Sequence, residues 1–253
     1  MPKFAVIIPA AGKSSRFHDK EKKPFATLEG RAVWLRTVEL FVNRNDVCQT
    51  MLIIAPEDQD LFERRYRANI VFMNVQVVLG GAERFDSVAN ALAKLKPEAE
   101  FVAVHDAVRP CCTPELVESV FTAAAQQGAA MLAVQVQDTV KQADANRYVK
   151  GTIPRESLWL AQTPQVFRKD WLVDAYARRQ QVPQPITDDA QLIEAVGHKV
   201  YLVNGASTNI KITTKEDLLL AQAILKSRPD PKPKGPIHPF AGEEEMWGGR
   251  GLK

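Results

Sequence analysis

The chain of 253 residues has few cysteines, little net charge and no long hydrophobic run. Cys48, Cys111 and Cys112 form no CxxC pair, and adjacent cysteines rarely pair with each other, which favours a reduced compartment. A net charge of +3 argues against a protein that binds nucleic acid through a concentrated basic face. No apolar run reaches the length of a membrane span, and Phe4–Ile8 is too short for a signal peptide. We therefore expect a cytoplasmic protein that binds neither nucleic acid nor membrane.

Several catalytic signatures are also missing. The sequence contains neither GxxxxGK[ST] nor GxGxxG, so it has no P-loop and no dinucleotide-binding fingerprint. It has no HExxH motif and no visible Ser–His–Asp arrangement. Hydrolysis through a covalent enzyme, or on zinc, is therefore disfavoured.

Short β-branched runs alternate with segments of helical spacing. Strands are predicted at residues 4–8, 51–55, 75–79, 101–105, 131–136 and 199–203. Helices are predicted at residues 32–42, 57–67, 87–95, 114–127, 169–179, 188–196 and 215–226. The alternation predicts an α/β fold with a mostly parallel sheet and helices on both faces. Ligands of such sheets bind at the carboxyl ends of the strands.

Two segments interrupt this alternation. Residues 137–155 lack a helical stripe and predict two polar strands around Asp144-Ala-Asn146, either an ordinary surface hairpin or a dimerisation arm. Residues 228–253 hold five of the 16 prolines and five of the 13 glycines, which predicts a flexible tail. We therefore expect one domain, residues 1–227, with the tail outside it.

The first candidate motif follows the first predicted strand. It reads Pro9-Ala10-Ala11-Gly12, with Arg16 and Lys23 downstream. Small residues allow backbone N–H groups to surround phosphate oxygens, and both cations can add charge. The alternative is a tight turn followed by a solvated basic run.

Two further motifs also follow strands. Gly80-Gly81 precedes a helix that contains Ser87, which fits either close approach to a flat ligand or a plain connection capped at Asp86 or Ser87. In the segment 104–110, Asp106 is a natural Mg²⁺ ligand beside phosphates, or the partner of Arg109 in a structural ion pair. His105 has no metal-ligand spacing to the other histidines and is expected in the core.

Downstream residues complete the candidate site. Thr163 and Thr187 lie in turn or cap patterns, and Lys211 is expected in a short strand. Together the motifs bring Arg16, Lys23, Arg155 and Lys211 to one edge of the sheet. Four cations beside glycine-rich loops fit a site for two phosphorylated ligands.

The ordered set of motifs resembles the 2-C-methyl-D-erythritol 4-phosphate cytidylyltransferase family, over about residues 3–226. Besides those above, it includes Asp138-Thr139-Val140-Lys141, Thr163-Pro164-Gln165, Thr187-Asp188 and Asn209-Ile-Lys-Ile-Thr213. The resemblance implies a Rossmann-like fold and a homodimer reached through the hairpin. It also implies transfer of a cytidylyl group from CTP to methylerythritol phosphate, with Mg²⁺ or another divalent cation, in isoprenoid precursor synthesis.

The resemblance also assigns roles to matching positions. Arg16 and Lys23 would be catalytic and stabilise the transition state. Arg155 and Lys211 would position methylerythritol phosphate, with Arg109, Thr139, Thr163 and Thr187 nearby. The residues that would hold CTP are Ala10, Ala11, Gly12, Gly81, Ser87 and Asp106, the last also beside the metal.

The sequence departs from the family pattern in two places and leaves two rivals. Lys13-Ser14-Ser15 replaces a more glycine-rich loop, and Ala82 replaces an acidic residue, which puts a ribose contact in doubt. One rival is a cytidylyltransferase for another alditol phosphate, such as ribitol 5-phosphate. The other is a non-catalytic nucleotide-sugar-binding protein, which is disfavoured because all four cations are present.

Overall fold

The structure is a computed structural model that describes residues 1–12, 22–182 and 185–229. A seven-stranded sheet of order β11-β7-β10-β6-β1-β4-β5 forms its centre. Only β10 pairs antiparallel with its neighbours; the other pairings in this sheet are parallel. The strands are β1 (Phe4–Pro9), β4 (Val47–Ile54), β5 (Val75–Leu79), β6 (Phe101–Val104), β7 (Ala129–Gln135), β10 (Trp159–Arg168) and β11 (Tyr201–Asn204).

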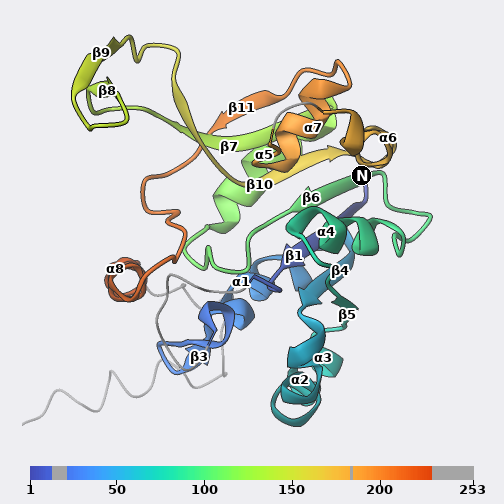
Figure 1. The fold of residues 1–253 in the computed structure, drawn as a ribbon. Coiled ribbons are helices and arrows are strands. Elements are labelled where there is room, and N and C mark those ends of the chain that lie inside the picture. The colour runs from blue at the N-terminus through green and yellow to red at the C-terminus, as the bar shows by residue number, and fades with distance from the viewer. Residues whose placement is uncertain (13–21, 183–184, 230–253) are drawn as a thin grey trace, which may run out of the picture.

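Helices cover both faces of this sheet (Figure 1). Alternate residues of β1 face opposite sides, so Val6 and Ile8 pack with α1 and α5, whereas Ile7 packs with α4, α6 and α7. This is the two-sided α/β arrangement that the sequence predicts. The helices are α1 (Val33–Val42), α2 (Gln59–Arg65), α3 (Arg67–Phe72), α4 (Arg84–Leu92), α5 (Pro114–Gln127), α6 (Lys169–Ala177), α7 (Asp189–Ala195) and α8 (Lys215–Lys226).

Smaller elements join this framework. A short hairpin of β2 (Thr27–Leu28) and β3 (Arg31–Ala32) follows the 3₁₀ turn η1 (Lys23–Phe25), and α8 packs against it through Ala221. Two further 3₁₀ turns are η2 (Pro56–Asp58) and η3 (Arg179–Gln181). No helix within the described residues is long and apolar enough to cross a bilayer.

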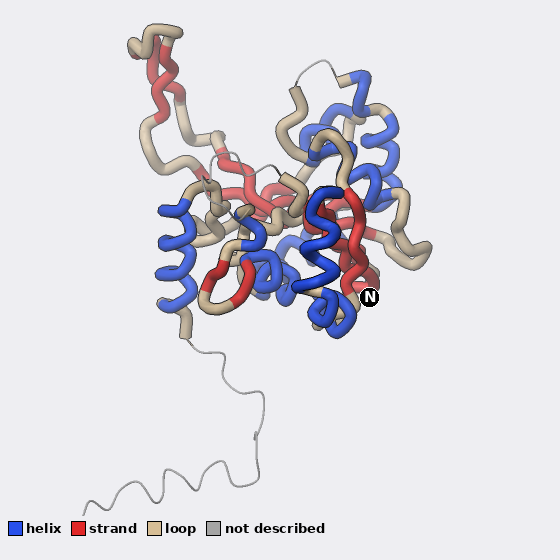
Figure 2. Tube along the Cα trace, turned by 60° about the horizontal axis from the view of Figure 1, so that its bottom comes forward, coloured by secondary structure: helices blue, strands red, loops and turns tan. Residues whose placement is uncertain are grey.

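The expected polar hairpin is present. Strands β8 (Val140–Ala143) and β9 (Val149–Ile153) pair antiparallel around Asp144. We call residues 137–155 the hairpin arm, because they extend away from the body of the molecule (Figures 1 and 2).

The sequence prediction was wrong about several elements. It missed β10, whose centre reads Gln162-Thr163-Pro164-Gln165 and so lacks a hydrophobic signature, although this part of the strand is buried. The single helix expected at residues 57–67 is divided into η2, α2 and α3. Helix α4 is capped by Glu83, in a capping box with Asp86, instead of at Asp86 or Ser87. Lys211 lies in a loop, not in a strand. The tail from residue 230 lies outside the described residues.

Candidate functional site

Two small-residue loops meet at the carboxyl ends of the parallel strands. The Ala10 N–H donates to Ile53 O at 2.8 Å, and the Gly80 N–H donates to Ile54 O at the same distance. A Cβ on Gly80 would lie 2.9 Å from the Cβ of Ala11, so the two loops touch where only glycine fits. These loops form one continuous small-residue surface at the edge where ligands of such sheets bind.

The Ser87 hydroxyl stabilises the second loop from within. It accepts a hydrogen bond from the Gly81 N–H at 3.0 Å and donates to Glu83 O at 2.9 Å. A Cβ on Gly81 would lie 2.5 Å from the Cβ of Asp86, so this residue must also be glycine. Ser87 therefore shapes the loop in this structure, which sequence reasoning did not foresee.

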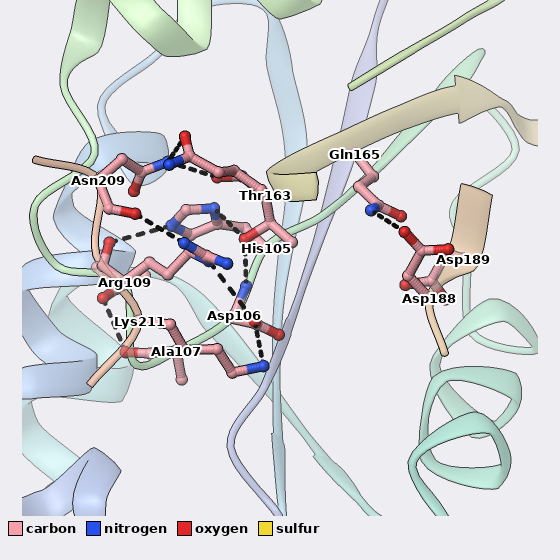
Figure 3. Close-up of polar contacts among 12 residues, drawn as sticks. His105, Asp106, Ala107, Arg109, Thr163, Gln165, Asp188, Asp189, Asn209 and Lys211 are labelled. Carbon is pink, nitrogen blue, oxygen red and sulfur yellow. Dashed lines mark hydrogen bonds and ion pairs between the residues drawn. The ribbon is translucent and has the colours of Figure 1, made fainter. Parts of the chain in front are cut away.

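A buried carboxylate surrounded by cations follows β6. Asp106 is only 7% exposed, and its Oδ2 lies 2.8 Å from Lys211 Nζ and 3.8 Å from Arg109 Nε. Burial alone would raise the pKa of Asp106, but Lys211, Arg84 and Arg109 together lower it to about 2. The Asp106–Arg109 ion pair that the sequence allowed is present, but the shorter contact is with Lys211 (Figure 3).

Thr163 on β10 orders the segment that carries Asp106. Its Oγ1 accepts from the Asp106 N–H at 3.1 Å and lies 3.1 Å from His105 Nδ1 (Figure 3). His105 Nε2 lies 3.3 Å from Arg109 O, and burial lowers the pKa of His105 to about 4. His105 is therefore a neutral core residue, as predicted. Thr163 contacts both the Asp106 backbone and the His105 ring, and so holds this segment in place.

The loop after β11 carries Lys211 to Asp106. The Asn209 side chain donates to Thr163 O at 3.0 Å and to Gln162 Oε1 at 3.2 Å, while Arg109 Nη1 donates to Asn209 O at 2.7 Å. The Ile212 N–H donates to Val108 O at 2.9 Å. These contacts place Lys211 without the strand that the sequence predicted. Asn209 is fully buried, and its amide was not predicted to have a role.

A second polar network, which sequence reasoning missed, connects α7 to the sheet. Gln165 on β10 donates to Asp188 Oδ2 at 2.9 Å and accepts from the Ala190 N–H at 3.0 Å. Asp189 Oδ2 lies 2.6 Å from Arg84 Nη2 at the start of α4. A glutamine beside the apolar pair Val166-Phe167 and two consecutive aspartates were the available sequence signals, but their partners are distant in sequence.

Lys22 and Lys23 are neighbours in sequence, but they have different roles in the structure around η1. Lys22 Nζ lies 2.7 Å from Asp58 Oδ2 and 3.0 Å from Glu57 Oε1. Lys23 begins η1, where the Phe25 ring packs 5.3 Å from the Phe62 ring and so anchors the turn. Arg16 lies outside the described residues.

The remaining predicted site residues are not joined to the Asp106 cluster. Thr139 and Arg155 are exposed on the hairpin arm, where Arg155 donates to Gln137 O. Thr187 is exposed, and its N–H and hydroxyl both contact Gln191 Oε1. Within this chain, the described residues therefore assemble one part of the predicted acceptor site, centred on Lys211, Arg109 and Thr163.

Other reactive groups are poorly suited to covalent chemistry. Burial raises the pKa of Cys111 to about 11 and that of Cys112 to about 12, so both stay as thiols at neutral pH. Among the described residues, no group of three or more His, Cys, Asp or Glu side chains is arranged to hold a metal.

An α/β sheet with small-residue loops and a cation-rich carboxylate at its strand ends is suited to phosphorylated ligands. The sequence model of the family described as 2-C-methyl-D-erythritol 4-phosphate cytidylyltransferase matches residues 4–227. The chain belongs to this family, a family of nucleotidyltransferases.

Individual relatives agree with this assignment. The enzyme of that name from Pelotomaculum thermopropionicum is 39% identical over 229 residues, which cover 90% of this chain and 96% of the relative. The crystal structure of 4-diphosphocytidyl-2C-methyl-D-erythritol synthase from Anaerococcus prevotii matches with a TM-score of 0.75 at 31% identity, over 89% of this chain and 99% of that one. The Thermus thermophilus cytidylyltransferase structure gives a TM-score of 0.73 at 32% identity, covering 87% and 98%.

Proposed function

We propose that this chain transfers the cytidylyl group of CTP to 2-C-methyl-D-erythritol 4-phosphate, giving 4-diphosphocytidyl-2-C-methyl-D-erythritol and pyrophosphate. Membership of the cytidylyltransferase family supports the reaction. The observation that carries the proposal is the Asp106 cluster, in which Lys211 and Arg109 lie beside small-residue loops at the strand ends. This arrangement suits two phosphorylated ligands that must be brought together.

The nucleotide side of the proposed site is the small-residue surface. Small residues there let a pyrimidine base and its phosphates approach the backbone closely, while the N–H groups of Ala10, Gly80 and Gly81 fix the loops within the protein. We assign the following residues to CTP: Ala10, Ala11, Gly12, Gly81, Ser87 and Asp106.

The acceptor side is proposed around Lys211 and Arg155. Both cations would position the acceptor phosphate, a role in which Arg offers a forked contact and Lys a compact charge. The residues assigned near this substrate are Arg109, Thr139, Thr163 and Thr187.

The proposed reaction depends more on positive charge around the phosphates than on proton transfer. The acceptor phosphate is already anionic, so its oxygen can attack the α-phosphorus of CTP without a general base, and pyrophosphate leaves. The main obstacle is repulsion between two anions, which cations close to the developing pentacoordinate phosphorus reduce. Arg16 and Lys23 are assigned to this role.

Asp106 would be a ligand of the divalent cation in this proposal. The carboxylate is ionised, because its pKa is lowered to about 2, and it offers the oxygen ligand that Mg²⁺ prefers. When bound beside the CTP phosphates, Mg²⁺ would neutralise charge on the leaving pyrophosphate. In this structure Lys211 neutralises the same carboxylate.

The proposal includes a homodimer in which each hairpin arm completes the acceptor site of the partner. Tyr148 and Val149 on the arm are 74% and 64% exposed, although apolar area of this kind favours contact with another surface. Arg155 and Thr139 would then serve the neighbouring protomer. We also propose that residues 1–227 form the catalytic domain, that residues 228–253 are a flexible tail, and that the enzyme works in the cytoplasm.

Pyrophosphate release tests the function directly. The purified chain, CTP and Mg²⁺ are incubated with methylerythritol phosphate, ribitol 5-phosphate or erythritol 4-phosphate, and ATP replaces CTP in a parallel series. Rapid release only with CTP and methylerythritol phosphate is expected. Faster release with ribitol 5-phosphate would identify the rival cytidylyltransferase, and binding of CTP without release from any acceptor would identify a non-catalytic protein.

A further inference from the structure

The Arg84 side chain joins the start of α4 to the start of α7. Arg84 begins α4, directly after the loop that contains the glycine pair, and its Nη2 lies 2.6 Å from Asp189 Oδ2 at the start of α7. Asp189 is fully buried, and its Oδ1 accepts a hydrogen bond from the Tyr176 hydroxyl. A buried carboxylate needs a partner of opposite charge, so Asp189 fixes the position of Arg84.

This ion pair uses only part of the guanidinium group. Arg84 Nη1 is buried and has no hydrogen-bond partner among the described residues. The positive charge of Arg84 also acts on Asp106, where only Lys211 has a larger effect in lowering the pKa. Asp189 explains the position of Nη2, but it does not explain why Nη1 is buried without a partner in the part of the chain that the structure describes.

The same helix has a second ion pair that permits a matched comparison. Arg179, in η3, places its Nη2 2.6 Å from Asp86 Oδ1 on α4. Both members of that pair are about one-third exposed, at 29% and 37%, whereas Asp189 is completely buried. Arg84 therefore joins α4 to a fully buried carboxylate of α7, whereas Arg179 joins η3 to a partly exposed carboxylate of α4.

We propose that Arg84 is a positioning residue of the site: anchored by the buried Asp189, it holds the glycine loop against the start of α7. This inference rests on the proposed function, in which the glycine loop carries the nucleotide and the region around α7 and Lys211 carries the acceptor. A residue that fixes both sides should affect the joining of the substrates more than the binding of either one.

A pair of variants separates positioning from stability. Arg84→Met leaves Asp189 buried and unpaired, so its melting temperature should fall clearly. Arg84→Met combined with Asp189→Asn removes both charges and should regain most of that loss. Its kcat should nevertheless remain about 10- to 100-fold below that of the unmodified protein, while the Kd for CTP rises only about 3- to 10-fold.

Two controls complete the experiment. Arg84→Lys keeps the positive charge and should retain a kcat several times that of the double variant. Arg179→Met disrupts the other ion pair of α4 and should lower kcat less than about 3-fold, as expected for a pair that is about one-third exposed. Recovery of kcat and CTP affinity together with stability in the double variant would overturn the proposal, as would an equal loss of kcat in Arg179→Met.

The outcome for Arg84 is separable from that of the proposed function. If the unmodified chain binds CTP but releases no pyrophosphate with any acceptor, the function fails. Calorimetry then tests Arg84 alone: a weaker Kd for CTP in the stable double variant supports its role in holding the glycine loop, and an unchanged Kd overturns it.

Discussion

The Asp106 cluster and the hairpin arm carry site residues in different ways. In the cluster, Asp106 and Asn209 are buried and hydrogen-bonded within one chain. Thr139 and Arg155 are exposed, and the arm that carries them extends away from the body of the molecule (Figure 1). Binding groups in a preformed pocket are usually fixed by such surrounding contacts. We therefore expect the cluster to be ready to bind within a single protomer, and we propose that the arm contributes at the surface of a partner.

The largest expected effect concerns the part of the site that belongs to one protomer. Lys23→Ala should lower kcat by about 100- to 1,000-fold, because its charge is proposed to act on the pentacoordinate phosphorus, while the Kd for CTP changes much less. Steady-state kinetics and calorimetry measure both quantities. Lys22→Ala is the neighbouring control, since Lys22 is paired with Asp58 and Glu57. Equal losses of rate and CTP affinity in Lys23→Ala would make this residue a simple binding group.

The second effect concerns the arm. Arg155→Ala should raise the KM for methylerythritol phosphate by about 10- to 100-fold and leave CTP affinity near normal, because only the acceptor loses a forked contact. Lys141→Ala is the control on the same arm, where Lys141 Nζ contacts Thr152 Oγ1 at 2.7 Å. Loss of CTP binding with an unchanged acceptor KM would reverse the assignment of the two phosphate sites.

Sequence reasoning predicted the sheet and its ligand-binding edge, but not the contacts between buried polar residues. Buried, nearly continuous runs such as Phe4–Pro9 predict a parallel sheet, and motifs directly after strands predict where ligands bind. Strand β10 was missed because Gln162, Thr163 and Gln165 are polar yet buried, and their partners lie on loops distant in sequence. For the same reason, no local pattern could reveal that Arg84 pairs with Asp189, 105 residues away.

The smallest expected effect is a change in folding stability with pH, which arises in the Asp106 cluster and not in the arm. The folded pKa of His105 is about 4, below its ordinary value of 6.5, so the folded state favours the neutral ring. Stability from this group is therefore fully present above pH 6.5 and is lost as the pH falls from 6.5 towards 4. Asp106, lowered from 3.8 to about 2, loses its contribution in a separate window at still lower pH.

Unfolding in urea at pH 7 and pH 4.5 measures this dependence. The free energy of unfolding should fall by about 2 kcal/mol more in the unmodified protein than in His105→Gln. Arg155→Ala, on the arm, should keep the pH dependence of the unmodified protein. An identical fall in His105→Gln and the unmodified chain would show that the buried ring does not resist protonation.

Complementation between two defective variants tests most directly whether the arm completes a site on its partner. Chains with Lys23→Ala and chains with Arg155→Ala are co-expressed, and pyrophosphate release is measured at low acceptor concentration. If the arm acts on the partner, one site of each mixed dimer has both side chains intact, and random pairing restores about a quarter of normal activity. If each arm serves its own chain, no site is intact, and activity no higher than the average of the two variants would contradict the account.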